Sequence, residues 1–176
     1  PIWPRAIPSI YQAFDQLVPR MGRPLVHYSM DAPQVHSDMP GRLLVDFGKE
    51  FQGGLELTVG NGVDGTKVRI VSGELLAANG SLDSETRSRI AASNTWGYAF
   101  NWTLRDGAQV LRQHNYMEFR YVALEFHPST IPTDLKIGAW GVKYEYVDSD
   151  STFKSNNATL NRVFELSRWT LDGGVL

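Results

Sequence analysis

The sequence predicts an all-β protein: a two-sheet antiparallel β-sandwich with a proline-rich N-terminal lead-in and one C-terminal helix. Three observations lead to this prediction. About seven short runs of aliphatic, β-branched and aromatic residues lie between residues 42 and 147. No helical pattern separates these runs, which disfavours a parallel sheet with crossover helices. After residue 147 the apolar spacing changes from that of a strand to that of a helix.

Residues 1–41 form the lead-in, which we expect to pack on the sandwich. Seven of the nine prolines lie here, and proline at this density blocks long helices and central strands. One short strand is expected at residues 25–28.

Residues 42–147 contain the strands of the predicted sandwich. In the run 53–60, Leu55, Leu57 and Val59 alternate with more polar residues, so one face is expected to be buried. The pairs Asn61-Gly62 and Asp64-Gly65 predict a hairpin into the next run, because these residues tolerate positive φ. A long polar loop is expected at 77–94. The predicted strands cover 42–48, 53–60, 66–76, 96–104, 109–113, 114–126 and 135–147.

Residues 148–176 predict a linker followed by a helix. Asn156 or Asn157 is a suitable N-cap, and Asp172-Gly173-Gly174 fits a C-terminal stop. A helix after a complete β-domain has little to pack on within this chain, so its apolar stripe predicts a missing neighbour. The stripe consists of Leu160, Val163, Phe164, Ser167 and Leu171.

The bulk composition excludes several classes of function. The chain has 176 residues, enough for one domain with a real core, and its net charge is -2. The 17 basic and 19 acidic residues are dispersed, which gives no support to nucleic-acid or membrane binding. Cysteine is absent, so thiolate metal sites and disulfides are excluded. The chain begins with Pro1 and shows no signal-peptide pattern, so we expect a processed or partial chain. Its location is unknown from the sequence, with an extracellular or periplasmic one favoured.

Arg120 interrupts the apolar pattern of the strand at 114–126. Strict alternation places it on one face with Val122, Leu124 and Phe126, and Phe119 on the other face with Tyr121. A guanidinium beside apolar side chains needs acceptors for its donors. Glu118, two residues away, lies on the same face as Arg120. A structural tie is the favoured interpretation, and a grip on a sugar hydroxyl or substrate carboxylate is the alternative.

No self-contained active site is visible in the sequence. The histidines lack metal-ligand spacing, no nucleotide-binding or nucleophile motif occurs, and no metal or cofactor is predicted. Trp96, Tyr98, Phe100 and Trp102 alternate on one face of a strand and would form either core or a flat platform for a sugar. We name Trp96, Tyr98 and Trp102 as carbohydrate-contact residues under the second interpretation.

The order of several motifs resembles the bacterial α-L-rhamnosidase family of glycoside hydrolases. These motifs are "LLVDFGKEFQGGLELTV", "GTKVRIVSGELLAANGSL", "HNYMEFRYVALEF" and "STFKSNNATLNRVFELSRWTL". Two departures stand out: Met117-Glu118 replaces the His-Gly of the family pattern, and "VSGELL" replaces its usual hairpin sequence. The matching positions are Asp46, Gly48, Gly54, Glu74, Arg120, Tyr121, Phe153, Ser155, Asn156 and Asn161.

The resemblance implies a concanavalin-like jelly roll that immediately precedes a catalytic (α/α)6 barrel. The barrel would carry the acid and the base of an inverting hydrolysis, so no catalytic residue is expected in this chain. Arg120 would then be a structural tie to Asp46 or Glu74, with Glu118 beside it. Leu160, Val163 and Phe164 would face the barrel, which would be the partner, with rhamnose-containing glycans as further ligands. The domains would be 1–41, 42–147 and 148–176. A free-standing carbohydrate-binding module and a small complete hydrolase are the alternatives.

Overall fold

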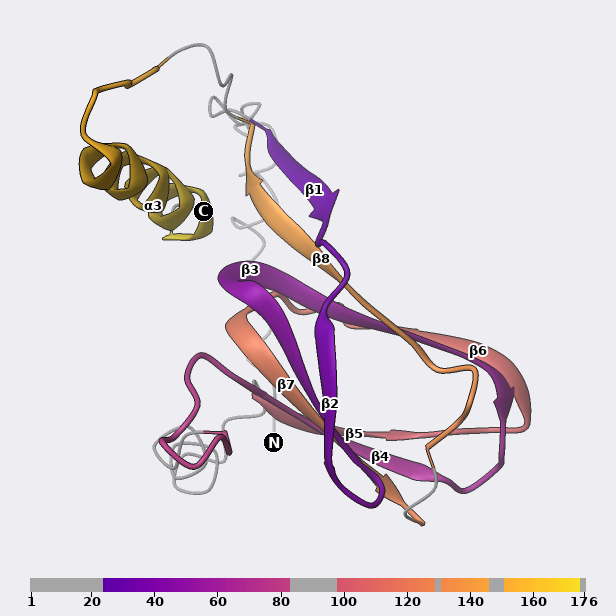
Figure 1. Cartoon of the computed structure of the whole chain (residues 1–176). Coiled ribbons are helices and arrows are strands. Elements are labelled where there is room, and N and C mark those ends of the chain that lie inside the picture. The colour runs from indigo at the N-terminus through magenta and orange to yellow at the C-terminus, as the bar shows by residue number, and fades with distance from the viewer. Residues whose placement is uncertain (1–23, 83–97, 129–130, 146–150, 175–176) are drawn as a thin grey trace, which may run out of the picture.

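The described residues form eight strands in two layers that share one long strand (Figure 1). The structure is a computed structural model, and it describes residues 24–82, 98–128, 131–145 and 151–174. The described elements are β1 (Leu25–Ser29), β2 (Gln34–Met39), β3 (Arg42–Gly62), β4 (Lys67–Gly73), β5 (Ala99–Thr103), β6 (Gly107–Arg112), β7 (Met117–His127), β8 (Lys136–Tyr144) and α3 (Ala158–Gly174).

The shared strand is β3, which changes neighbours half-way along its length. Its first half lies between β2 and β7, and that layer continues from β7 through β4 to β5. Its second half lies between β6 and β8, and that layer continues from β8 to β1. All of these pairings are antiparallel. The predicted all-β, two-layer antiparallel sandwich with a C-terminal helix is therefore confirmed.

The two strands predicted at 42–48 and 53–60 are one bent strand. The pairing of β3 with β7 runs regularly to Asp46 and resumes at Phe51, so residues 47–50 leave the ladder. We call residues 46–51 the β3 corner. Beyond it, Leu55, Leu57 and Val59 are buried and the residues between them are more exposed, as the alternation predicts.

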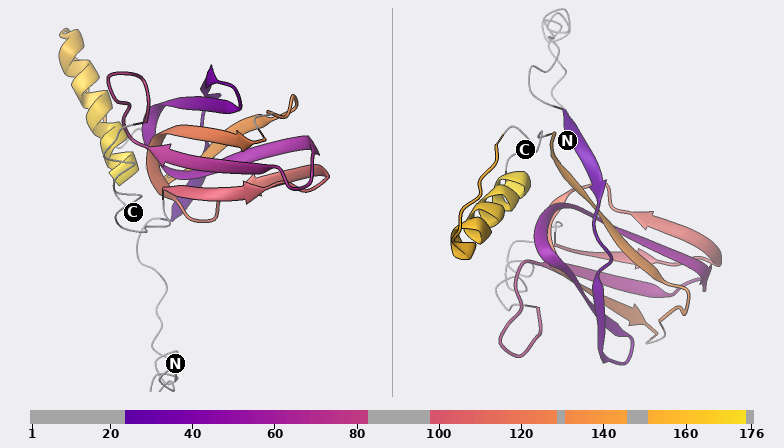
Figure 2. Two further views of the ribbon diagram at one scale, coloured as in Figure 1. Left: turned by 90° about the horizontal axis from the view of Figure 1, so that it is seen from below. Right: turned by 45° about the horizontal axis from the view of Figure 1, so that its top comes forward.

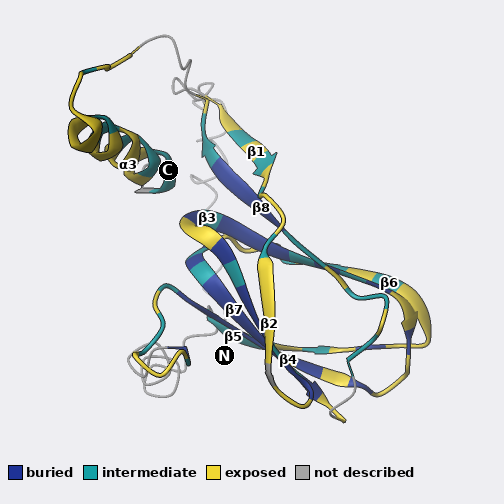
Figure 3. Cartoon of the chain, viewed as in Figure 1, coloured by how far each residue is buried: buried dark blue, intermediate teal, exposed yellow. Residues whose placement is uncertain are grey.

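The core lies between the two layers (Figure 3). Its largest fully buried side chains are three phenylalanines, Phe51, Phe119 and Phe126. Burial of so many large apolar side chains is the main term that stabilises the sandwich. The main cluster consists of Val45, Phe47, Phe51, Leu55, Leu57, Val68, Ile70, Leu104, Met117, Phe119, Val122, Leu124, Phe126 and Ala139.

The hairpin predicted at 61–66 is wrong. A tight turn does occur, with Gly65 at φ 79° and the Thr66 amide donating to the carbonyl of Val63. However, the second half of β3 lies in a different layer from β4, and the two strands do not pair. The second half of β3 already has β6 on one side and β8 on the other, so no edge is left for β4. The turn therefore carries the chain from one layer to the other.

The proline-rich segment contributes a strand to each layer. The strand expected at 25–28 is present as β1, which pairs with β8. β2 was not predicted, because Pro33 and Pro40 enclose it and its sequence, QVHSDM, is mostly polar. It lies at the edge of the first layer, where proline flanks are tolerated. The sandwich thus includes residues that precede position 42.

The strict alternation predicted for β7 fails at Arg120. Phe119 packs in the same cluster as Val122 and Leu124, whereas Tyr121 belongs to a second cluster. Two residues three positions apart share a face only if the strand is irregular between them. The irregularity lies opposite the β3 corner, where β3 supplies four residues without partners. Arg120 therefore does not share a face with Val122.

The C-terminal helix lies beside the sandwich, next to the bend of β3 (Figures 1 and 2). Asn157 caps it: its Oδ1 accepts hydrogen bonds from the amides of Thr159 at 2.9 Å and Leu160 at 3.4 Å. Within the described residues, no helix has both the length and the apolarity needed to cross a membrane.

Candidate functional site: the β3 corner and the cleft beside it

Arg120 and Asp46 form a two-pronged ion pair at the β3 corner. Nε of Arg120 donates to Oδ1 of Asp46 at 2.8 Å, and Nη2 donates to Oδ2 at 2.9 Å. Oδ1 also accepts the amide of Gly48 at 2.7 Å. Gly48 has φ 78°, a conformation that favours glycine. One carboxylate therefore joins β7 to β3 and holds the turn of the chain at Gly48.

The electrostatics of this pair favour its charged form. The hydrogen bonds from Arg120 lower the pKa of Asp46, outweighing the opposite effect of its burial, and the Gly48 amide lowers it further. The same bonds raise the pKa of Arg120. The guanidinium also lies over the ring of Tyr121, 4.7 Å from its centroid. Two of the five N–H donors of Arg120, and one face of its guanidinium, are thus engaged within the fold.

Glu74 and Glu118, the other two members of the predicted tie, are not bonded to Arg120. They lie near a third carboxylate, Glu50, whose pKa is raised by burial first and then by the charges of Glu118 and Glu74. The structure thus brings three glutamates together beside the Asp46–Arg120 pair. Within the described residues, no group of three or more histidine, aspartate or glutamate side chains has a metal-binding arrangement.

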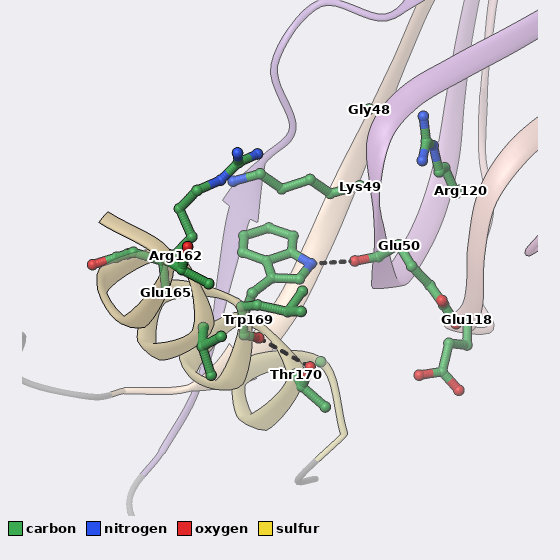
Figure 4. Close-up of a pocket in the computed structure, with 13 residues that line it drawn as sticks. Gly48, Lys49, Glu50, Glu118, Arg120, Arg162, Glu165, Trp169 and Thr170 are labelled. Atoms are coloured by element: carbon green, nitrogen blue, oxygen red, sulfur yellow. Dashed lines mark hydrogen bonds between the residues drawn. The ribbon is translucent and has the colours of Figure 1, made fainter. Parts of the chain in front are cut away.

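The β3 corner also contacts α3. The indole Nε1 of Trp169 donates to the carbonyl oxygen of Glu50 at 2.5 Å (Figure 4). The ammonium of Lys49 lies 4.5 Å from the centroid of the same indole. Two successive residues of the corner therefore hold one aromatic side chain of the helix. Sequence reasoning missed these three residues, although the charged pair Lys49-Glu50 inside an apolar strand was a visible signal.

A second contact holds the last turn of α3. The Nζ atom of Lys143 on β8 lies 3.4 Å from Oδ2 of Asp172. Tyr28 on β1 lies nearby, and burial, together with the charge of Asp172, raises its pKa to about 12. The helix is thus fixed to both layers near its C-terminal end.

An open cleft of about 820 Å³ separates the rest of α3 from the sandwich. Lys49, Glu50 and Trp169 line it, and Figure 4 shows the side chains of Arg162 and Lys49 reaching toward each other. Two apolar side chains of the helix, Val163 and Leu166, line the cleft but stay exposed. The full lining is Gly48, Lys49, Glu50, Glu118, Arg120, Thr159, Arg162, Val163, Glu165, Leu166, Trp169, Thr170 and Gly173.

The aromatic row lies on β5 and the residues just before it. Phe100 and Trp102 pair with Ile70 and Val68, and they pack against the core between the layers, as Tyr98 does. This placement agrees with the core interpretation of the row. Trp96 lies outside the described residues. Contact between Trp96, Tyr98 or Trp102 and a sugar stays a prediction.

The apolar residues expected to face a barrel lie on α3. Leu160 is 49% exposed and Val163 is 53% exposed. Phe164 is half-buried, with its ring centroid 5.3 Å from that of Phe153. Leu166, at 66% exposed, extends the same apolar area. An exposed group of this kind is typical of an interface.

Comparison with known proteins identifies the family. A family model described as the bacterial α-L-rhamnosidase concanavalin-like domain matches residues 37–143, more than half of the chain. The chain belongs to this family. A comparison with curated protein sequences gives no match. The family's matched region begins within β2 and ends within β8, so it contains the β3 corner, Asp46 and Arg120.

Solved structures of α-L-rhamnosidases share the fold of this family member. The enzyme from Dictyoglumus thermophilum superposes with a TM-score of 0.67 at 20% identity, over 89% of this chain and 17% of its own. The enzyme from Streptomyces avermitilis, solved with L-rhamnose, gives 0.68 at 20% identity, over 91% and 15%. The family 78 rhamnosidase of Bacillus sp. GL1 gives 0.57 at 20% identity, over 80% and 14%. The chain therefore spans a small fraction of the length of these proteins.

Proposed function

We propose that this chain is an accessory, non-catalytic β-sandwich of a larger α-L-rhamnosidase-like glycoside hydrolase. The observation that carries the proposal is the match to the rhamnosidase concanavalin-like domain, together with solved rhamnosidases of which the chain covers only 14–17%. The polar residues at the β3 corner support it, because Arg120 and Asp46 are bonded to one another rather than held open toward a ligand.

The partner in this proposal is a catalytic barrel that packs against α3. The apolar contact area consists of the exposed side chains of Leu160, Val163 and Leu166. Burial of such side chains against a neighbouring domain contributes about 25 cal/mol per Å² of apolar surface. The domain would thereby act as a scaffold that borders the barrel.

Two measurements test the non-catalytic role. Purified chain is incubated with an aryl α-L-rhamnoside, and we expect no release of the aryl alcohol above the rate of a heat-denatured sample. The coding sequence is then read beyond the codon for Leu176, where we expect a domain rich in helices. Turnover at an enzyme-like rate by the 176 residues would refute the proposal.

A third measurement tests the contact with the barrel. In the longer protein, Leu160→Asp and Val163→Asp should lower the melting temperature and the rhamnosidase activity, because each places a charge in the interface. Val110→Asp is the matched control, since Val110 is 61% exposed on β6, away from the helix. Equal effects of all three changes would contradict the assignment of the helix face.

The prediction of sugar contact is tested separately. L-Rhamnose and rhamnose-capped oligosaccharides are titrated into the chain and into a Trp102→Phe variant, with binding followed by NMR. If the chain has only an accessory role, we expect no saturable change in NMR chemical shifts in either sample. Saturable binding that Trp102→Phe weakens would favour a carbohydrate-binding module instead.

A further inference from the structure

The β3 corner is fixed from inside and from outside. On the inside, Phe47 and Phe51 pack edge-to-face at 5.5 Å, and Phe51 lies 4.6 Å from Phe119. On the outside, the carboxylate of Asp46 holds Arg120 and the Gly48 amide. Between these anchors the chain has no ladder partner on β7, so its path depends on them.

The contact that the corner makes with α3 is small and depends on orientation. The Glu50 carbonyl must point at the indole N–H, and the Lys49 ammonium must lie over the ring. A hydrogen bond weakens steeply when its donor and acceptor are misaligned. A small change in the path of the β3 corner would therefore break the bond between Trp169 and the Glu50 carbonyl. Lys49 and Glu50 follow directly after Gly48, whose amide Asp46 holds.

Among the described residues, the polar contacts found between α3 and the strands lie near its C-terminal end. Trp169 and Asp172 make polar contacts with the sandwich, whereas Val163 and Leu166 line an open cleft and are 53% and 66% exposed. The N-terminal half of α3 is therefore held away from the strands. An element with few buried contacts takes its orientation from the contacts it has.

From these observations, we infer that the β3 corner is a socket that sets the orientation of α3, and that Asp46 and Arg120 are positioning residues for the helix. The pair acts through Gly48, Lys49 and Glu50 on Trp169. Loss of the pair would free the helix to pivot while the two layers stay paired. This role does not depend on the proposed function, because every contact it uses lies within the chain.

Two variants and one control test the inference by hydrogen exchange. Arg120→Gln removes the two-pronged bond to Asp46, and Trp169→Phe removes the N–H donor but keeps an aromatic ring over which Lys49 can lie. Glu125→Gln is the control: Glu125 lies on the same strand and its carboxylate is 3.6 Å from Arg69 and 3.9 Å from Arg42. We expect amides of residues 166–174 to exchange about tenfold faster in the first two variants and unchanged in the control.

A distance measurement gives a readout that a purely structural tie would not move. The chain has no cysteine, so Ser167→Cys on α3 and Thr103→Cys on β5 accept one spin label each. The distance distribution between the labels should broaden in Arg120→Gln and in Trp169→Phe, and the double variant should broaden no further. Glu125→Gln should leave it narrow.

Three results would overturn the inference. The first is unchanged exchange in α3 after Arg120→Gln. The second is a rise in α3 exchange no larger than the loss of global stability, measured by denaturation, accounts for, which would make Arg120 a general tie of the fold. The third is a double variant whose effects add. If Arg120→Gln does not fold, Asp46→Asn takes its place under the same criteria, since it removes the charge and keeps the shape of the side chain.

Discussion

Gly53 lies where the backbones of β3 and β8 pass close to each other, and its replacement gives a sharp test of the fold. A Cβ atom at this position would lie 1.9 Å from the carbonyl oxygen of Trp140 and 2.9 Å from the Cα atom of Gly141. Both are backbone atoms of the neighbouring strand, so no side chain can move aside. Gly53→Ala would have to push β3 away from β8 by about 1.5 Å to reach ordinary contact.

The cost of this change follows from what the displacement breaks. Overpacking costs about 1–3 kcal/mol, and each ladder hydrogen bond that is lost adds about 1 kcal/mol. With two such bonds the free energy of unfolding should fall by about 3–5 kcal/mol. For a chain of this size, that corresponds to a melting temperature lower by roughly 6–20 °C.

Two other glycines in the same layer provide graded controls. A Cβ atom at Gly54 would meet the indole of Trp140 at 2.7 Å, a side chain that is buried but can shift, so an intermediate loss is expected. At Gly138 the nearest atom is the Glu56 carbonyl oxygen at 3.9 Å, so Gly138→Ala should change stability by no more than about 0.5 kcal/mol.

The assay is urea denaturation followed by circular dichroism, with thermal melts as a check. We expect Gly138→Ala to be the most stable of the three variants, Gly54→Ala to be intermediate, and Gly53→Ala to be the least stable. If Gly53→Ala is as stable as Gly138→Ala, the two strands do not approach each other as described and the reasoning fails.

Three further predictions concern ionisable groups. Arg120→Ala should lower the free energy of unfolding by about 1–2 kcal/mol, which corresponds to a melting temperature roughly 2–8 °C lower. The response of the chain to L-rhamnose should not change. Lost sugar affinity at an unchanged melting temperature would make Arg120 a ligand contact. Because the pKa of Asp46 lies below its ordinary value of 3.8, the stability that Asp46 provides should be present above pH 3.8 and be lost as the pH falls through the lowered pKa. The difference in unfolding free energy between the parent chain and Asp46→Asn, measured by denaturation at several pH values, should therefore shrink only in strong acid. A loss of this difference between pH 5 and 7 would contradict the prediction. Tyr28 should ionise near pH 12 instead of 10, which makes folding less favourable as the pH rises above 10. The difference in ultraviolet titration between the parent chain and Tyr28→Phe measures the pKa of Tyr28, and Asp172→Asn should lower this pKa. An ordinary value near 10 would show that Tyr28 is not buried.

The sequence predicted the elements with clear periodicity and missed those that depend on the whole fold. Alternation in Leu55, Leu57 and Val59, and the cap at Asn157, are local signals, and both are present in the structure. The hairpin at 61–66 was wrong because turn residues report a local bend and do not report which edges of the sheet are still free. β2 was missed because an edge strand needs little apolar character.

The candidate site could be predicted only in part, because some of its contacts depend on the whole fold. Arg120 stood out because a charge within an apolar strand needs an acceptor, and Asp46 was one of the acceptors considered. Its face was predicted wrongly, since the interruption of β3 between Asp46 and Phe51 breaks the alternation of the opposite strand. Trp169 gave no signal, because it contacts Glu50, 119 positions away in the sequence.

The continuity of β3 through both layers has a consequence for cooperativity. A sandwich built from two separate sheets can lose one sheet while the other keeps its ladder intact. Here each layer uses part of the same strand as an inner member, so melting of either half strips partners from the other. We therefore expect the strands to unfold in a single transition, and a protein divided at Gly48 to yield two insoluble fragments, each with an unpaired central edge.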